Sequence, residues 1–345
     1  KKGYKFMKKN IFTKITFILI LISLPNIVKA EMNISGSMEF HYINQDPGTT
    51  TSGASNDKFH SDQKIDLEFT NKTDSGMILS MFQTLRSNGT EAVSALESDG
   101  NYFSLEGGFG YIGLGNFGGI GDELTPTAAD LIGPGSTDGK APQFYSSTGS
   151  LTSQQASLIN IIDAENNITY KLPAMGNLTI GASYKDAGDG VSANADETVL
   201  AGSYEFTSGD ITGTFAVASN SIGGATAGAG STNSSSMGLT LVSGSFTAIV
   251  AQAEDDQSTS ITTEVNDYGL SFTVDDNLTL AVTGTEVSES SGAETLDITS
   301  VSAKYTITNG LDAYFTYHDY DYGAGTSGAT SDDGSATLVS LEATF

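Results

Sequence analysis

The feature that most constrains this chain is a regular alternation of short and long connections between strand-like segments. Within a segment apolar and polar side chains alternate, as in residues 65–69, 178–182 and 311–317, which is typical of a β-strand with one apolar face. The short connections are residues 71–76, 107–109, 173–176, 207–209, 243–244, 275–276 and 308–310. The connections between them are longer, polar and rich in Gly and Ser. This alternation predicts antiparallel hairpins with tight turns at one end and long loops at the other.

The hairpins recur with a nearly constant period. The first apolar residues after five successive turns are Leu178, Ile211, Phe246, Leu278 and Leu311, which lie 33, 35, 32 and 33 residues apart. Counting the segments predicts sixteen strands, near 32–43, 60–70, 77–86, 100–106, 110–116, 166–172, 177–185, 197–206, 210–218, 235–242, 245–253, 263–274, 277–286, 296–307, 311–320 and 336–345. The loop after the fifth strand, about 117–165, is about one period too long.

Three architectures share a repeated hairpin. A solenoid or propeller has a period of this size, but it buries its apolar faces and does not sort short turns from long loops. A secreted β-sandwich needs a larger hydrophobic core than these thin, Gly-rich strands provide. A transmembrane barrel has strands of ~9–11 residues, apolar outside and polar inside, with short turns at one rim and long loops at the other. In hydrocarbon every strand must be hydrogen-bonded along both of its edges, and a sheet meets this requirement only when it closes into a barrel. The pattern therefore favours an all-β fold, a transmembrane antiparallel β-barrel of sixteen strands.

The chain is expected to consist of a targeting segment, residues 1–30, and a barrel domain, residues 31–345. A basic stretch begins at Met7, residues 15–24 are nearly all apolar, and Ala30 offers a small residue at a cleavage site. This is the pattern of a cleavable secretory signal peptide, with a few residues upstream of the start. The apolar run is too short for a membrane anchor, because a helix needs ~20 residues to cross a bilayer.

Charge and composition exclude several classes of function. The sequence has 15 basic residues, 41 acidic residues and no cysteine. Removing residues 1–30 takes away seven lysines and no acid, so the remaining net charge is 8 − 41 = −33. Nucleic-acid binding requires a basic surface, and a thiolate metal site or nucleophile requires cysteine. His41, His60 and His318 are scattered and form no metal-ligand spacing. We therefore expect no nucleic-acid partner, no cofactor, no metal site and no catalytic residue.

Several stretches resemble one known family in combination. Residues 102–115 read Tyr-Phe-Ser-Leu-Glu-Gly-Gly-Phe-Gly-Tyr-Ile-Gly-Leu-Gly, residues 167–170 are followed by Pro173 and Gly176, and residues 337–345 form an alternating strand that ends on an aromatic residue. These stretches are similar to strands four and five, six and seven, and the last strand of the Gram-negative general porins. Members of that family are trimeric, sixteen-stranded diffusion channels of the outer membrane. The resemblance covers residues 31–345, mostly as pattern and not as identity.

The resemblance implies a water-filled pore for passive diffusion of ions and small hydrophilic solutes in the bacterial outer membrane. The third extracellular loop would fold into the lumen and narrow it, so its early acids Asp122, Glu123 and Asp130 are the constriction candidates. Phe345 would be the assembly signal that the barrel assembly machinery reads. The implied partners are outer-membrane lipid and lipopolysaccharide, and two further copies of the chain in a homotrimer. The sequence has Asn116 where the family usually has Arg, which removes one pore cation.

Strand phase predicts which charged side chains face the lumen, because apolar residues set the outward phase. The predicted lumen-facing wall contains Lys64, Asp66, Glu68, Arg86, Glu106 and Lys171. Together with the loop acids, the carboxylates outnumber the basic groups, so we expect the pore to prefer cations.

Two other classes of function fit the pattern less well. A surface receptor or adhesin is expected to have several large, aromatic loops, whereas here only the loop after the fifth strand is large. A barrel enzyme, such as an outer-membrane protease or lipase, needs a catalytic constellation that three scattered histidines do not form.

Overall fold

The computed structural model describes residues 31–46, 58–89, 97–132, 166–186, 196–223, 232–256, 262–290, 295–323 and 332–345. The predicted targeting segment, residues 1–30, and the second part of the long loop lie outside the described residues. Within the described residues, no helix is long and apolar enough to cross a membrane.

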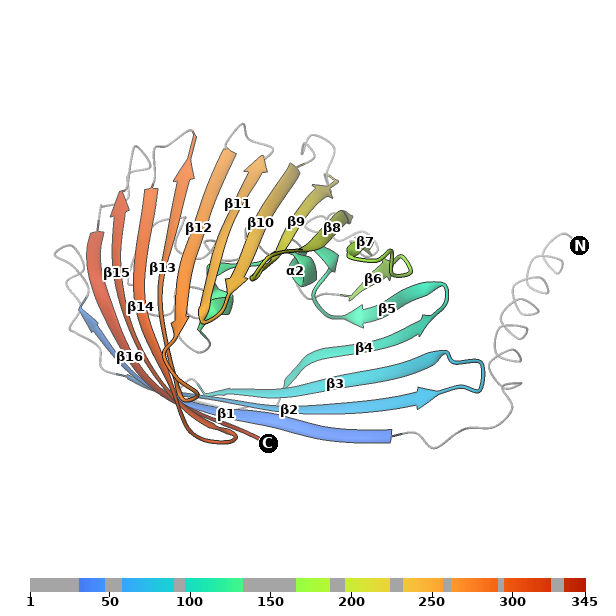
Figure 1. Ribbon diagram of the computed structural model, residues 1–345, viewed down its shortest axis with the longest axis horizontal. Coiled ribbons are helices and arrows are strands. Elements are labelled where there is room, and N and C mark those ends of the chain that lie inside the picture. The colour runs from blue at the N-terminus through green and yellow to red at the C-terminus, as the bar shows by residue number, and fades with distance from the viewer. Residues whose placement is uncertain are drawn as a thin grey trace, which may run out of the picture.

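The described residues form a closed antiparallel barrel of sixteen strands, in which every strand pairs with its neighbours in the sequence (Figure 1). Pairing of β1 with β16 closes the barrel, with Ser37 opposite Thr344 and Asp46 opposite Ser335. The strands are β1 Glu31–Asp46, β2 Lys58–Lys72, β3 Ile78–Gly89, β4 Glu97–Gly107, β5 Gly110–Asn116, β6 Asn166–Lys171, β7 Leu178–Lys185, β8 Glu197–Ser208, β9 Ile211–Ile222, β10 Thr232–Ser243, β11 Phe246–Asp256, β12 Thr262–Thr273, β13 Leu278–Glu289, β14 Thr295–Thr308, β15 Leu311–Gly323 and β16 Asp332–Thr344. The predicted closure and strand number are confirmed.

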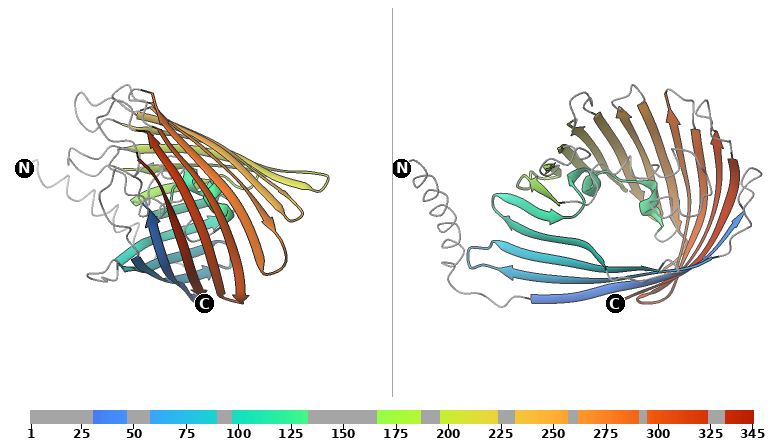
Figure 2. Two further views of the ribbon diagram at one scale, coloured as in Figure 1. Left: turned by 90° about the vertical axis from the view of Figure 1, so that its left-hand side faces the viewer. Right: turned by 180° about the vertical axis from the view of Figure 1, so that it is seen from behind.

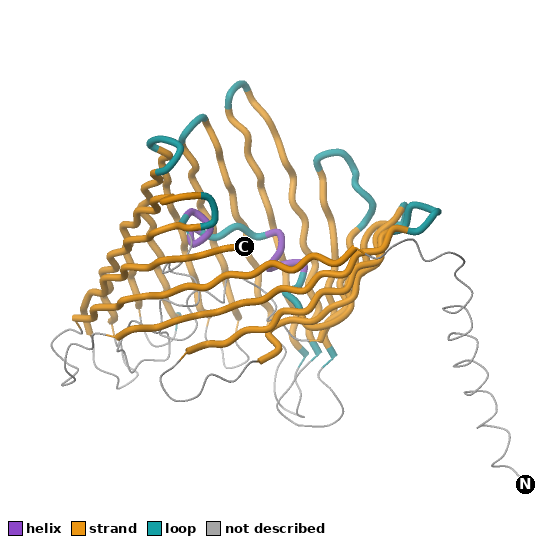
Figure 3. The backbone as a smooth tube through the Cα atoms, turned by 90° about the horizontal axis from the view of Figure 1, so that it is seen from below, coloured by secondary structure: helices purple, strands orange, loops and turns teal. Residues whose placement is uncertain are grey.

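The short turns gather at one rim of the barrel (Figure 3), and the strands are tilted relative to one another in side view (Figure 2). The turns between β8 and β9 and between β10 and β11 contain Gly209 and Gly244, whose φ angles are 61° and 57°. A two-residue hairpin turn needs this left-handed backbone, which glycine adopts without steric cost. Turn chemistry therefore explains why Gly stands at these positions.

Many strands extend further toward the long loops than their sequence pattern predicts. For example, β9 ends at Ile222 instead of near 218, and β10 begins at Thr232 instead of near 235. The added residues are mainly Ser, Thr and Asn, which break the apolar alternation but still donate and accept ladder hydrogen bonds. The apolar pattern therefore marks only part of each strand.

The outer face of the barrel is apolar. On β9, Phe215 and Val217 are each 44% exposed, whereas the alternate residues Ala216 and Ala218 are buried. The same alternation occurs around the barrel and leaves an outward band that includes Ile34, Met81, Ile168, Leu200, Met237, Val250, Leu270, Val282, Val301 and Val339. Apolar side chains that face outward are expected where lipid, and not water, surrounds a barrel.

Part of the inner face is also apolar, contrary to the expected polar interior. Val265, Leu296, Ile298, Tyr322 and Leu338 are buried inward-phase residues of one hydrophobic cluster on β11–β16 and β1. They lie toward the long-loop ends of these strands and pack on one another, so they are shielded from water. Alternation alone could not predict this cluster, because here the apolar phase faces inward and the outward phase is polar, as at the exposed Asp297 between Leu296 and Ile298, which reverses the rule that apolar residues face outward.

Candidate functional site

The first part of the long loop lies against the inner wall of the barrel. It contains the short helix α2, Ile120–Leu124, and the 3-10 helix η1, Ala128–Leu131, which lie inside the ring of strands (Figure 1). The Ile120 side chain is fully buried and packs against Val199, Ala201 and Ala218, which are inward-phase residues of β8 and β9. Residues 133–165 of this loop lie outside the described residues.

Two backbone N–H groups anchor this segment to the wall. Ile120 N donates a hydrogen bond to Ser183 Oγ on β7 at 2.8 Å. Ala128 N donates to Asp267 Oδ2 on β12, and the other oxygen of Asp267 accepts from Thr285 Oγ1 at 2.9 Å. Asp267 is 4% exposed, so its buried carboxylate is stabilised by these donors. The anchors hold the segment against two different parts of the wall, on β7 and β12.

Three inward-phase glycines make room for the segment. A Cβ atom on Gly181 of β7 would lie 2.7 Å from Ile120 Cγ1, and one on Gly238 of β10 would lie 2.7 Å from Cδ and Cγ of Pro126. A Cβ on Gly269 of β12 would lie 2.5 Å from Leu131 Cδ1. All of these distances are shorter than van der Waals contact, so the loop occupies the space that side chains would fill.

The predicted constriction acids differ in their surroundings. Glu123 Oε1 lies 2.6 Å from Lys171 Nζ, and the same ammonium lies 4.3 Å from the centre of the Tyr111 ring. Asp122 is half-buried in α2. The backbone of Asp130 belongs to η1, and its side chain lies outside the described residues. The structure therefore brings one loop acid onto the predicted wall residue Lys171.

The other predicted wall residues lie on β2, β3 and β4. Strand register places Lys64 directly opposite Arg86, and Glu68 opposite Phe82, so these four side chains share the inner face. Arg86 Nε donates to both carboxylate oxygens of the buried Asp62, at 3.0 and 3.1 Å. The remaining predicted members share this face: Asp66 lies 3.3 Å from Lys64, and Glu106 pairs with Tyr111 across β4 and β5.

Further ion pairs line the inner face in positions that sequence reasoning missed. Lys185 Nζ lies 4.0 Å from Glu197 Oε2, and Lys304 Nζ lies 2.9 Å from Asp312 Oδ2. Asp62 was also missed, although it lies in phase with Lys64 on a predicted strand, so strand phase could have found it. Asp267 carried no comparable indication, because its role depends on a loop residue 139 positions away.

The predicted assembly residue lies at the seam of the barrel. Phe345 N donates to Gly36 O and Gly36 N donates to Phe345 O, both at 3.1 Å. The Phe345 side chain is 73% exposed. The chain end therefore continues the pairing between β16 and β1 and presents its aromatic ring outward.

The described residues contain no group of three or more His, Asp or Glu side chains that could hold a metal ion. Paired charges and hydroxyl groups line the inner wall, around a space that the loop bounds on one side. This arrangement sets electrostatic and steric barriers for a solute.

Comparison with known proteins gives one family match and several structural likenesses. The model of the Gram-negative porin family matches residues 18–345. An anion-selective porin from Comamonas acidovorans has 15% sequence identity and a TM-score of 0.64, covering 92% of this chain and 100% of that one. A mutant of the Rh. blastica porin has 12% identity and a TM-score of 0.65, covering 91% and 100%. A loop-deletion mutant of OmpT, an outer membrane protein of Vibrio cholerae, has 13% identity and a TM-score of 0.65, covering 92% and 99%.

The structural likenesses at these identities show the fold alone, and no curated protein sequence matches the chain. The family match, in contrast, spans every strand of the closed sixteen-stranded barrel. The chain belongs to the Gram-negative porin family, whose members are non-enzymatic channels of the bacterial outer membrane.

Proposed function

We propose that this porin forms a water-filled channel for passive diffusion of ions and small hydrophilic solutes, that the loop segment 117–132 narrows it, and that it prefers cations. One observation carries the cation preference. Five basic side chains of the inner face each lie within 4.0 Å of a carboxylate: Lys64 with Asp66, Arg86 with Asp62, Lys171 with Glu123, Lys185 with Glu197, and Lys304 with Asp312.

This pairing matters because a neutralised base contributes little field to a permeating ion, while additional acids still contribute. Glu68 and Glu106 share the inner face of the same wall. Charges outside the barrel are screened over about 8 Å at physiological ionic strength. Charges inside a narrow lumen with low-dielectric walls are screened less, since the field is focused through the opening.

Reversal potentials across a salt gradient in a planar bilayer test this proposal. The wild type is expected to prefer cations, and the variant Asp122→Asn, Glu123→Gln, Asp130→Asn is expected to shift the reversal potential toward anions. A matched control changes three outward-phase acids, Glu264→Gln, Asp297→Asn and Asp319→Asn, and should leave it unchanged. Anion preference of the wild type, or an equal shift in both variants, would show that the loop acids do not set the selectivity.

We also propose how the barrel assembles and what surrounds it in the membrane. We expect three copies of the chain to form a homotrimer in the outer membrane, in contact with lipopolysaccharide. The apolar outward band supplies a surface suited to lipid or to another barrel. Mass measurement of the detergent-extracted particle tests the trimer, and a particle containing one chain would contradict it.

A further inference from the structure

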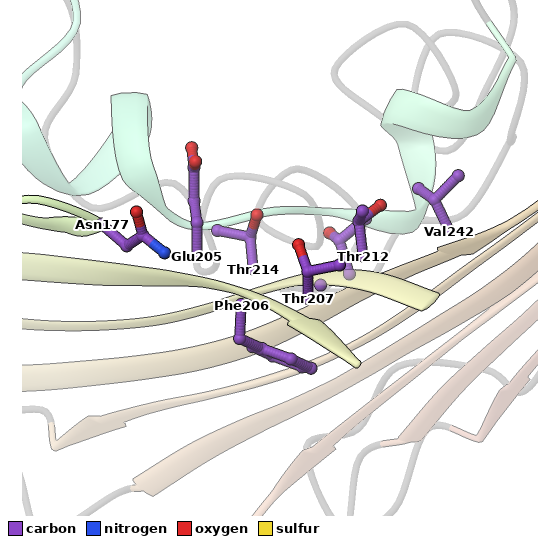
Figure 4. Close-up of a pocket in the computed structure, with 9 residues that line it drawn as sticks. Asn177, Glu205, Phe206, Thr207, Thr212, Thr214 and Val242 are labelled. Atoms are coloured by element: carbon purple, nitrogen blue, oxygen red, sulfur yellow. The ribbon is translucent and has the colours of Figure 1, made fainter. Parts of the chain in front are cut away.

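A pocket of about 340 Å³ lies on β8, β9 and β10, near the short-turn rim. Its polar lining consists of Thr207, Thr212, Thr214, Thr240, Glu205 and Asn177. Figure 4 shows the labelled threonines and Glu205 pointing to one side of the sheet, while Phe206 points to the other.

Strand register arranges these groups as a small grid. Glu205 lies opposite Thr214, which lies opposite Thr240, in one row across the three strands. Thr207 lies opposite Thr212 in the next row toward the turns. Neighbouring strands are about 4.8 Å apart, and alternate residues along a strand are about 6.8 Å apart. The grid therefore presents hydroxyl groups at several points around one small space.

The grid belongs to the inner face and adjoins the loop. Thr240 lies two positions after Gly238 on β10, and therefore on the same face, and Gly238 is the residue that Pro126 covers. A solute that passes the loop toward the short-turn rim on this side of the barrel reaches the grid next. Glu205, Thr207 and Thr212 are exposed, so they are accessible from the lumen.

The chemistry of the lining selects a class of solute. Each threonine hydroxyl both donates and accepts hydrogen bonds, the Asn177 amide does the same, and the Glu205 carboxylate accepts only. No lysine, arginine or histidine lines the pocket, so it lacks the donors that bind phosphate or carboxylate. The volume lies at the lower end of the range of about 300–1,000 Å³ found for small-molecule sites.

We propose that this pocket is a weak binding site for a neutral polyhydroxylated solute of monosaccharide size. The inference rests on the proposed channel function, because it requires the solute to enter the lumen. The site would hold a sugar-like molecule near the short-turn end of the pore through its hydroxyl groups.

Glucose-induced noise in the ion current of the full-length protein in a planar bilayer tests the site. The wild type is expected to show noise that saturates with glucose concentration. The double variant Thr212→Val, Thr214→Val keeps the branched side-chain shape and removes two hydroxyls. Its half-saturating concentration should rise about tenfold, since two hydrogen bonds are lost. Conductance without glucose should stay unchanged, and it also reports that the barrel is folded.

The control is Thr70→Val, which removes an inner-face hydroxyl from β2, on another part of the wall, and should leave glucose noise unchanged. Glu205→Gln should weaken glucose binding less than the double variant does, because an amide still forms hydrogen bonds. A conducting wild type without saturable glucose noise, or a double variant with wild-type affinity, would overturn the site. If the saturable glucose noise depended on Glu205 and not on the threonines, the assignment of the site to a polyhydroxylated solute would be overturned. A wild type that does not conduct at all would instead overturn the proposed channel function.

Discussion

Substituting Gly238 by Ala is expected to push the loop away from the wall and lower the conductance. The new Cβ would lie 2.7 Å from Cδ and Cγ of Pro126, whereas ordinary van der Waals contact begins at 3.4 Å. Restoring ordinary contact therefore requires a shift of 3.4 − 2.7 = 0.7 Å. The proline ring cannot rotate out of the way, since its atoms are fixed to the backbone. The displacement is directed into the lumen, because the wall lies on the other side.

The loop is expected to bulge and not to detach, because its anchors stabilise it by more than the overpacking costs. Overpacking of a well-packed site costs about 1–3 kcal/mol. Detachment would lose the hydrogen bond of Ile120 N, about 0.5–1.5 kcal/mol, and that of Ala128 N to the Asp267 carboxylate, about 1.5–3 kcal/mol. It would also expose the Ile120 side chain, at about 1.5–3 kcal/mol. The anchors together exceed the overpacking term, so the segment stays on the wall and protrudes at Pro126.

Single-channel conductance in a planar bilayer is the assay, and Gly238→Leu extends the series. We expect conductance to fall from wild type to Gly238→Ala and further to Gly238→Leu. The matched control is Gly202→Ala, an outward-phase strand glycine whose Cβ would lie 3.3 Å from Thr179 O and 3.7 Å from Ile180 Cγ1, away from the loop. Wild-type conductance in Gly238→Leu, with a folded barrel, would refute the idea that this segment limits the pore. A rise in conductance would show that the anchors yield first.

Three further predictions concern charge and assembly. Asp62→Asn removes the carboxylate that Arg86 hydrogen-bonds with, so reversal potentials should shift toward anions; a shift toward cations would contradict the pairing argument. Lys171→Met removes the ammonium beside Glu123, so the shift should have the opposite sign, and equal signs in the two variants would show that pairing is irrelevant. Deleting Phe345 removes the residue whose backbone pairs with Gly36 and should impair outer-membrane assembly without altering export; a normal heat-modifiable barrel in the deletion strain would refute its role.

The architecture was predictable because a transmembrane barrel leaves a local pattern in its sequence. The period of two within strands and the sorting of turns by length are properties of neighbouring residues, and the closed barrel follows from the need to pair every strand edge. Strand ends were less predictable. The Ser, Thr and Asn residues at the end of β9 pair through their backbone, and backbone pairing does not depend on the side-chain pattern that marks a strand.

The packing of the loop was not predictable, since it depends on contacts between distant parts of the chain. Gly181, Gly238 and Gly269 look like any glycine in a Gly-rich strand, and only the structure shows that Ile120, Pro126 and Leu131 occupy the space beside them. The resemblance to porins implied a loop inside the barrel, but it could not say which wall residues hold the loop.

The charges of the inner wall show why a count of residues is a weak guide to the field in a pore. Lys64 lies directly opposite Arg86, and like charges in this position destabilise a sheet. Each base instead lies beside a carboxylate of β2 that is two positions from Lys64: Asp66 pairs with Lys64, and Asp62 pairs with Arg86 of the neighbouring strand β3. Two bases that phase analysis would count as a positive strip are therefore neutralised by strand register. Under the proposed cation preference, the acids without such a partner are the ones expected to set which ions the lumen favours.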